Sequence, residues 1–168
     1  MFKNLHAIVF DFDGVLTDNF VYVNQEGEET VRCSRSDGLG FDALRRTKVK
    51  LFILSTETNK VVTARSKKIK IPVFQGISNK EQSLKELAER ENIDLKFVLY
   101  VGNDMNDYKA MMSCGYSACP SDSHPNILKI ARFVLNTRGG CGVVRELVEE
   151  TLKLNRYDFL NSGNRDQS

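Results

Sequence analysis

Two aspartates separated by one residue follow the first apolar run of the chain, in the sequence Asp11-Phe12-Asp13-Gly14. Carboxylates crowded together in a half-buried site repel one another unless a cation lies between them. Their hard oxygen atoms favour Mg²⁺, which binds through one or two carboxylates together with waters and substrate phosphate. A second carboxylate can attack phosphorus as a nucleophile or transfer a proton as a general acid–base. The pair predicts metal-assisted phosphoryl chemistry, and its simpler alternative is a solvated strand end.

Polar residues also follow the next three apolar runs. Ser55, Thr56 and Glu57 come after the second run, Lys80 lies shortly beyond the third, and the acid-rich loop 102–107 follows the fourth. A hydroxyl and an ammonium group can donate hydrogen bonds and charge to phosphoryl oxygens as negative charge spreads over them in the transition state. Taken singly, Ser55 would be a helix N-cap, Lys80 a surface lysine and the loop an ordinary helix start. Their joint order at four strand ends favours phosphoryl transfer.

The elements that must position these residues alternate along the chain. Short apolar runs predict strands, and the amphipathic segments between them predict helices. The alternation indicates an α/β fold with three layers, a parallel sheet covered by helices on both faces. Because sites in such sheets lie at the carboxyl ends of the strands, we expect the four polar segments to meet there. The expected strands are 6–10, 49–54, 73–74, 97–101, 116–119 and 133–135, and the expected helices are 38–47, 59–69, 80–90, 105–113, 125–130 and 143–152.

One segment interrupts the alternation just after the first strand. The apolar segments 20–23 and 30–33 flank the turn-like sequence Asn24-Gln25-Glu26-Gly27, which predicts a β-hairpin over about 19–33. An exposed hairpin this apolar would favour association with another surface. Asp37, shortly after the hairpin, is expected to be a helix N-cap.

Composition excludes several classes of protein. The 168 residues suit one domain, predicted to span 1–160 and to be followed by a flexible tail at 161–168. The net charge of +2 gives no warrant for nucleic-acid binding. No apolar run approaches the roughly 18 residues needed to cross a bilayer, and Asp11 interrupts the apolar start, so we expect no membrane span and no secretory signal. Four cysteines without metal-site or C-x-x-C spacing predict free thiols and a cytoplasmic location.

In their order, and over nearly the whole chain, these segments resemble motifs I to IV of the haloacid dehalogenase (HAD) superfamily of phosphatases. The resemblance implies a Rossmann-like HAD fold with no separate cap domain. It implies that Asp11 is the nucleophile that becomes an aspartyl phosphate. Asp13 would be the general acid–base, with its main-chain carbonyl on Mg²⁺. Ser55 would bind the phosphoryl oxygens, and Lys80 would offset the charge on Asp11 and the phosphoryl group.

The fourth motif departs from the family pattern. The residue after Gly102 is usually an aspartate that binds Mg²⁺ directly, and here it is Asn103. An amide oxygen can ligate a hard cation but brings no charge, so weaker Mg²⁺ binding is expected. Beside the aspartate pair of the first motif, the candidate metal ligands are Asn103, Asp104 and Asp107. Whether Asn103 or Asp104 is the direct ligand stays open.

The hairpin and the glycine-rich segment 138–146 are similar to one subfamily. It contains 3-deoxy-D-manno-octulosonate 8-phosphate (KDO8P) phosphatases, relatives acting on KDN or sialic acid 9-phosphates, and HAD domains fused to sialic-acid cytidylyltransferases. The resemblance implies an eight- or nine-carbon sugar acid phosphate as substrate and a homotetramer in which a neighbouring subunit covers the site. Arg65 and Lys68, on one helix face, would bind substrate from that neighbour, with a solvated surface as the alternative. The other candidate substrate-binding residues are Thr56, Glu57 and Arg138.

Two other functions remain as alternatives. A receiver domain also gathers acids, a hydroxyl and a lysine around Mg²⁺. Its phospho-acceptor follows a later strand, whereas the third apolar run here ends in Gln75-Gly76 without an acid. The second alternative is a weakly active or non-catalytic HAD module that serves assembly beside a sialic-acid cytidylyltransferase, and Asn103 is its best support. Because the nucleophile, acid–base, serine and lysine of the motifs are all present, the enzyme is favoured.

Overall fold

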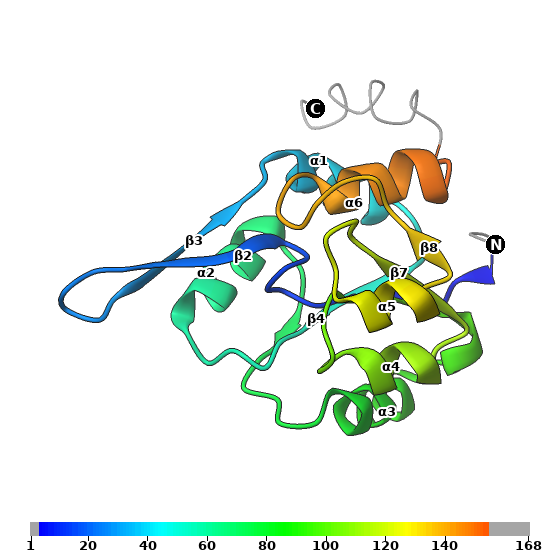
Figure 1. Cartoon of the computed structure of the whole chain (residues 1–168). Helices are drawn as coiled ribbons and strands as arrows, with labels where there is room; N and C mark the ends of the chain where they lie inside the picture. The colour runs from blue at the N-terminus through cyan, green and yellow to red at the C-terminus, as the bar shows by residue number, and fades with distance from the viewer. Residues whose placement is uncertain (1–3, 155–168) are drawn as a thin grey trace, which may run out of the picture.

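A six-stranded parallel sheet runs through the centre of the protein (Figure 1). The structure is a computed structural model, and it describes residues 4–154. The predicted end of the domain at 155–160 and the predicted tail at 161–168 lie outside the described residues. The strand order is β5-β4-β1-β6-β7-β8, which confirms the predicted α/β fold. The strands are β1 (Ala7–Phe10), β4 (Lys50–Leu54), β5 (Val73–Phe74), β6 (Val98–Val101), β7 (Tyr116–Cys119) and β8 (Phe133–Val134).

The central strand β1 aligns the ends of its two neighbours. Phe10, its last residue, lies opposite Ile53 of β4 and Val101 of β6. All four residues of β1 and of β6 are buried, as expected for strands covered on both faces. The loops that follow β1, β4 and β6 therefore leave the sheet side by side, at its carboxyl edge.

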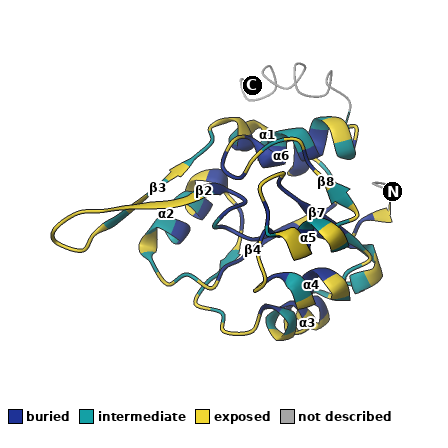
Figure 2. Cartoon of the chain, viewed as in Figure 1, coloured by how far each residue is buried: buried dark blue, intermediate teal, exposed yellow. Residues whose placement is uncertain are grey.

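Helices cover both faces of the sheet. Ile8 and Phe10 pack into one apolar cluster, and Ala7 and Val9 into another, because successive side chains of a strand point to opposite faces. Figure 2 shows the buried strands enclosed between the two helical layers. The helical segments on the face of Ile8 are α1 (Ser36–Leu44), α2 (Lys60–Ile69), α6 (Val143–Glu146) and the π-helical segment η3 (Leu147–Thr151). The helices on the face of Val9 are α3 (Lys80–Glu91), α4 (Tyr108–Ser113) and α5 (Pro125–Ile130). A short 3₁₀ turn, η2 (Leu95–Phe97), connects α3 to β6.

The predicted hairpin is present and extends away from the body of the protein (Figure 1). It consists of β2 (Thr17–Val23) and β3 (Glu29–Cys33), paired antiparallel. Asn24 Oδ1 accepts two main-chain N–H groups of the turn, at 3.0 and 2.9 Å. The four apolar side chains at 20–23 are 53 to 69% exposed and lie on the yellow arm of Figure 2. A patch of this kind marks a surface suited to burial against a partner.

The expectation that Asp37 caps its own helix is wrong. The N-cap position of α1 is Arg35, which makes no capping side-chain hydrogen bond. Asp37 instead lies inside α1, and its Oδ1 accepts the N–H of Val144 in α6 at 2.8 Å. The N-cap of α6 is Gly142, whose φ of 105° suits glycine and which offers no side chain of its own. The carboxylate from α1 therefore serves as the cap of α6.

Several predicted helix boundaries move by a few residues. The helix predicted over 38–47 spans Ser36–Leu44. The helix predicted over 105–113 begins only at Tyr108, because Asp107 N donates to Asp104 O and closes a turn before it. The segment predicted as one helix over 143–152 divides into α6 and the wider π-helical segment.

Within residues 4–154, no helix has the length and apolar character needed to span a bilayer. Cys33, Cys114, Cys119 and Cys141 are all free thiols, as predicted. Burial raises the pKa of Cys114 to about 12, so this thiol stays protonated.

Candidate active site

The loops at the carboxyl edge of the sheet enclose a hollow of about 240 Å³. It lies where the sequence predicts a site, after β1 and β6 with Thr56 from the loop after β4. The residues that line it are Asp11, Asp13, Asn19, Thr56, Asn103, Asp104 and Asn106. Every one of these side chains carries oxygen ligands or hydrogen-bonding groups, so the hollow suits a cation and an oxyanion.

Lys80 joins two carboxylates beneath this hollow. Its Nζ lies 2.6 Å from Asp11 Oδ1 and 2.7 Å from Asp107 Oδ1, and all three side chains are at most 5% exposed. Burial lowers the pKa of Lys80, but attraction to Asp11 and Asp107 outweighs this and raises it above its usual value. The pKa of Asp11 is also raised, by burial and by repulsion from Asp107, against the opposing effect of Lys80. Lys80 is thus a fixed ammonium group beside the Asp11 carboxyl.

Asp107 connects Lys80, the Tyr100 hydroxyl and the loop after β6 through hydrogen bonds. Its Oδ1 also accepts the Tyr100 hydroxyl at 2.9 Å, and its Oδ2 accepts the main-chain N–H of Asn103 at 2.9 Å. A Cβ on Gly102 would lie only 2.6 Å from Asp107 Cβ, so this close approach requires glycine. Asp107 does not line the hollow. Asp107, predicted as a metal ligand, thus contacts Lys80 and the main chain of Asn103 and is not among the residues that line the hollow.

Asp13 lies at the rim of the hollow, half-buried. Its Oδ1 accepts the Thr17 hydroxyl at 3.2 Å. Burial raises the pKa of Asp13, and the Thr17 hydrogen bond opposes this shift. A partly buried carboxyl group whose pKa is raised is better suited to giving and taking protons than a fully solvated one.

Asn103 places its amide against two oxygen atoms of the first loop. One amide atom faces the hollow and lies 3.3 Å from Asp11 Oδ2 and 2.8 Å from Asp13 O. Neighbouring ligands of octahedral Mg²⁺ are separated by about 2.9 Å, since Mg–O bonds are about 2.0–2.1 Å. With its oxygen inward, the amide places an oxygen 2.8 Å from Asp13 O and 3.3 Å from Asp11 Oδ2, close to this spacing. These residues therefore fit a hard divalent cation.

Of the three groups gathered here (the Asp11 carboxyl, the Asp13 carbonyl and the Asn103 amide), only Asp11 contributes a side-chain carboxylate. Among the described residues, no group of three or more His, Cys, Asp or Glu side chains is arranged to hold a metal ion. Asp104 lines the hollow, but its Oδ1 accepts the N–H of Met105 at 2.7 Å. The groups gathered at this point of the hollow, and so the candidates for holding a cation, are the Asp11 carboxyl, the Asp13 carbonyl and the Asn103 amide, with Asp104 nearby.

Comparison with known proteins shows the family to which the chain belongs. A family model described as haloacid dehalogenase-like hydrolase matches residues 41–147, more than half of the chain. The chain belongs to the haloacid dehalogenase-like hydrolases.

Several relatives of this HAD-like hydrolase bear the name of a phosphatase. The 3-deoxy-D-manno-octulosonate 8-phosphate phosphatase KdsC of Salmonella typhi is 32% identical over 148 residues, which cover 88% of this chain and 79% of the relative. A putative HAD family hydrolase from Streptomyces avermitilis is 41% identical, with a TM-score of 0.85 and coverage of 88% and 84%. The KDO8P phosphatase of Moraxella catarrhalis, solved with magnesium, phosphate and KDO, is 30% identical, with a TM-score of 0.86 and coverage of 90% and 88%. The predicted class, a phosphoric monoester hydrolase, is confirmed.

The serine predicted for the hydrolase site is buried directly after β4. Ser55 Oγ accepts the N–H of Glu57 at 3.1 Å, which leaves its hydroxyl proton to donate elsewhere. Glu57 is tied to its own loop, because Oε1 accepts the N–H groups of Thr58 and Asn59 at 2.7 and 2.9 Å. Asn59, not Ser55, caps α2. Of the three predicted residues in this segment, only Thr56 lines the hollow.

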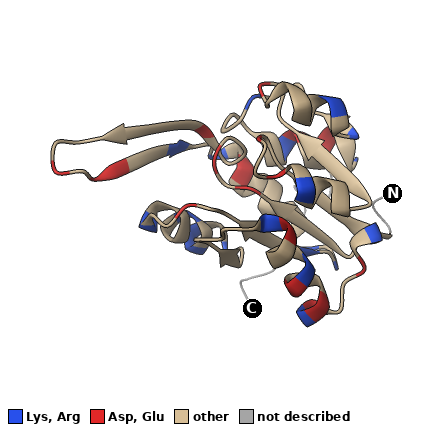
Figure 3. Cartoon of the chain, turned by 60° about the horizontal axis from the view of Figure 1, so that its bottom comes forward, with Lys and Arg blue, Asp and Glu red and all other residues tan. Residues whose placement is uncertain are grey.

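The predicted basic residues lie apart from the hollow. Arg65 and Lys68 are on α2, which carries several Lys and Arg side chains and no acid (Figure 3). They line a separate hollow of about 240 Å³ with Arg35 and Arg45. Arg65 Nη2 also donates to Ser34 O at 2.6 Å. Within one chain these two residues do not line the hollow that holds Asp11.

Arg138 is also outside the hollow. It is exposed, and its Nε lies 3.2 Å from Asp122 Oδ2, while Gly139 N donates to Asp122 Oδ1 at 2.9 Å. The glycines that follow pack tightly on the first loop: a Cβ on Gly139 would lie 2.3 Å from Gly14 O. This segment therefore supports the loop that carries the aspartate pair.

Sequence reasoning missed four residues of this site. Asn19 and Asn106 line the hollow, Tyr100 bonds Asp107, and Asp122 holds the Arg138 segment. Asn19 has a φ of 65°, a left-handed backbone conformation that asparagine adopts more readily than most residues. Its position shortly after the first motif was the sequence signal that could have placed it at the site. Tyr100 lies within an apolar run and gave no such signal.

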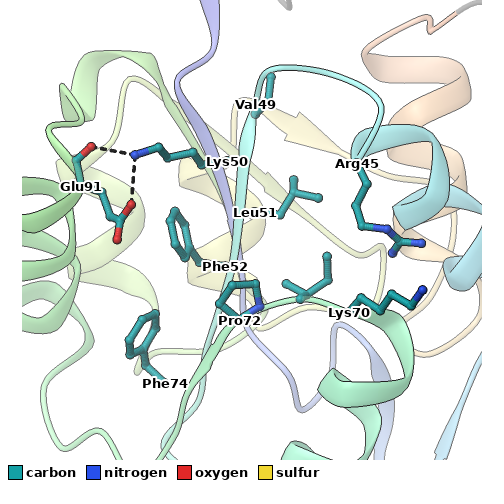
Figure 4. A pocket seen from close by; sticks show the side chains of 10 residues that line it. Arg45, Val49, Lys50, Leu51, Phe52, Lys70, Pro72, Phe74 and Glu91 are labelled. Atoms are coloured by element: carbon teal, nitrogen blue, oxygen red, sulfur yellow. Dashed lines mark hydrogen bonds and ion pairs between the residues drawn. The ribbon is translucent and has the colours of Figure 1, made fainter.

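A hollow of about 410 Å³ lies at the opposite end of the sheet, at the start of β4 (Figure 4). Its lining is largely apolar, with Leu51, Phe52 and Phe74 among the side chains drawn. Its carboxylate, Glu91, is paired with Lys50 at 2.9 Å. This hollow lacks the pair of aspartates and the asparagine oxygens that line the smaller polar hollow, which is therefore the stronger candidate for chemistry.

Proposed function

We propose that this hydrolase is a Mg²⁺-dependent phosphomonoesterase that releases phosphate from a 3-deoxy-2-ulosonic acid phosphate through an aspartyl phosphate. The observation that carries the proposal is the Asp11 carboxyl, with Oδ1 on Lys80 and Oδ2 in the oxygen set of the hollow. Candidate substrates are KDO8P, KDN-9-phosphate and N-acetylneuraminate-9-phosphate. The printed names of the KdsC relatives support the first of these.

In the first step, a carboxylate oxygen of Asp11 attacks phosphorus and the bond from phosphorus to the sugar oxygen breaks. Asp13 gives its proton to that leaving oxygen. Lys80 and Ser55 donate hydrogen bonds and positive charge toward the phosphoryl oxygens, on which negative charge spreads in the transition state. This stabilisation lowers the activation barrier. In the second step, Asp13 takes a proton from water, the water oxygen attacks phosphorus, and the bond to Asp11 breaks. Asp11, the Asp13 carbonyl and Asn103 would hold Mg²⁺, which would supply positive charge to stabilise the negatively charged phosphoryl group.

A second copy of the chain would complete the substrate site. The hollow is small and open, and the exposed apolar hairpin offers a surface for association. Arg65 and Lys68 from a neighbour suit a substrate that carries a carboxylate as well as a phosphate. We propose that the chain forms the homotetramer that the subfamily resemblance implies, with subunits that close one another's active sites, and that it acts in the cytoplasm, where thiols such as its four free cysteines stay reduced.

The test is phosphate release with Mg²⁺ from the three candidate substrates, with chelator as the control. We expect chelator-sensitive turnover of one of them at a clearly higher kcat/KM than the others. Absence of turnover of all three by a folded protein would contradict the proposal. It would favour the second candidate, an assembly module of low activity, for which the uncharged Asn103 is the specific support.

A further inference from the structure

Asn103 sits on a backbone that is fixed from two sides. Its main-chain N–H donates to Asp107 Oδ2 at 2.9 Å, and its carbonyl accepts the N–H of His124 at 2.9 Å. The residue is 7% exposed, and Gly14 lies so close that a Cβ there would be 1.9 Å from Asn103 Nδ2. The remaining freedom is rotation of the planar amide about its terminal torsion, which has two broad positions. That rotation exchanges Oδ1 and Nδ2 at the same place.

The two orientations have opposite chemistry toward the first loop. With Oδ1 inward, the amide faces two acceptors, Asp11 Oδ2 and Asp13 O, and the three oxygens are stable together only around a cation. With Nδ2 inward, the amide donates to Asp11 Oδ2 at 3.3 Å and to Asp13 O at 2.8 Å. We propose that Asn103 is a two-position residue: Oδ1 binds the divalent cation, and Nδ2 replaces the cation when none is bound.

The charges around Asn103 explain why an amide is suited to this task. Asp11 and Asp107 are two buried carboxylates that share one ammonium group, that of Lys80. A third carboxylate at position 103 would face Asp11 Oδ2 with no donor between them, and unpaired buried charge is strongly destabilising. The amide adds no charge and supplies two hydrogen bonds instead. The inference rests on the metal site of the proposed function, but not on turnover or on the identity of the substrate.

If Asn103 has both roles, replacing it by aspartate should strengthen Mg²⁺ binding but lower the stability of the metal-free protein. Asn103→Asp supplies a charged ligand, so we expect a Kd for Mg²⁺ that is at least about tenfold lower. The same change removes both amide hydrogen bonds and adds repulsion, so we expect the Tm in chelator to fall by roughly 4 °C or more. Saturating Mg²⁺ should restore this loss, because a bound cation stabilises the folded state.

The experiment measures Mg²⁺ binding by calorimetry and thermal unfolding in chelator and in saturating Mg²⁺. The matched control is Asn106→Asp, which adds the same charge to the same loop and the same hollow. It lacks the two contacts of Asn103, so we expect a much smaller change in both properties. Asn103→Ala removes both amide positions, so we expect weaker binding and a lower Tm in chelator together.

Three results would overturn the proposal. They are Asn103→Asp with the wild-type Kd and the wild-type Tm in chelator, Asn106→Asp with the same effects as Asn103→Asp, and Asn103→Ala with wild-type binding. If Asn103→Asp folds only when Mg²⁺ is added, that dependence is the expected effect in its strongest form. A protein that turns over none of the substrates but shows the expected Kd and Tm changes would refute the proposed function and leave this inference standing.

Discussion

Replacing Lys80 by methionine tests the buried charge cluster that carries the site. The change keeps an apolar stem of similar length but removes the ammonium group within 2.7 Å of both Asp11 and Asp107. Removing one partner of a buried ion pair costs about 3–5 kcal/mol, because the remaining charge is left unpaired. For a domain of this size that corresponds to a Tm lower by roughly 6–20 °C.

The pH dependence of the variant has a definite sign. Burial and Asp107 already raise the pKa of Asp11, and losing Lys80 removes an effect that lowers it. A carboxyl whose folded pKa lies above its unfolded value is penalised at pH above the folded pKa, and the penalty disappears below the unfolded pKa. The destabilisation by Lys80→Met should therefore be largest at neutral pH and shrink as the pH falls toward 4.

Urea unfolding at pH 7 and at pH 5 measures both effects. Lys85→Met is the matched control, since Lys85 lies on the same helix and pairs with Glu81 at 2.6 Å but is 47% exposed. An exposed pair of this kind contributes about 0.3–0.5 kcal/mol. If Lys80→Met cost no more than Lys85→Met, or if its cost did not depend on pH, the account of the buried cluster would be refuted.

Two further predictions concern residues outside the hollow. Burial raises the pKa of Asp37 to about 6, above its unfolded value of 3.8, so wild-type stability should rise by about 2 kcal/mol relative to Asp37→Asn as the pH falls from 7 to 4. Asparagine keeps the Oδ1 acceptor for Val144, so parallel stability curves from pH 4 to 7 would contradict this reading. Arg65→Ala should raise KM by about tenfold or more with little change in kcat, as loss of a charged hydrogen bond to substrate costs about 1.5–3 kcal/mol. An unchanged KM would limit Arg65 to its bond with Ser34.

The strand ends could be predicted from the sequence because each rests on a local pattern. The runs that end before Asp11 and Gly102 are buried on both faces, and such strands are continuous apolar segments. Parallel strands in a covered sheet must end at a common edge, so the polar residues after them could be grouped before any coordinates were known. Lys80 was correctly placed near that edge, although its bond to Asp107 was not foreseen.

The details that sequence could not supply are contacts between distant segments. Asp37 caps a helix that begins more than 100 positions later, so its local pattern favoured the wrong helix. Tyr100 belongs to an apolar run, and only the fold shows its hydroxyl on Asp107. The placement of Asp107 beneath the hollow, instead of in it, depends on the tight turn at Gly102.

The most direct test of the central claim is phosphate release by Asp11→Asn, measured with Mg²⁺ and the best substrate beside the wild-type protein. Asparagine preserves shape at this position, and Lys80 keeps its pairing with Asp107, so the circular dichroism spectrum and oligomeric state should not change. The account predicts a loss of about 10⁴-fold or more in kcat, as expected when a covalent nucleophile is removed. Turnover near the wild-type rate by this folded variant would contradict the assignment of Asp11 as the nucleophile.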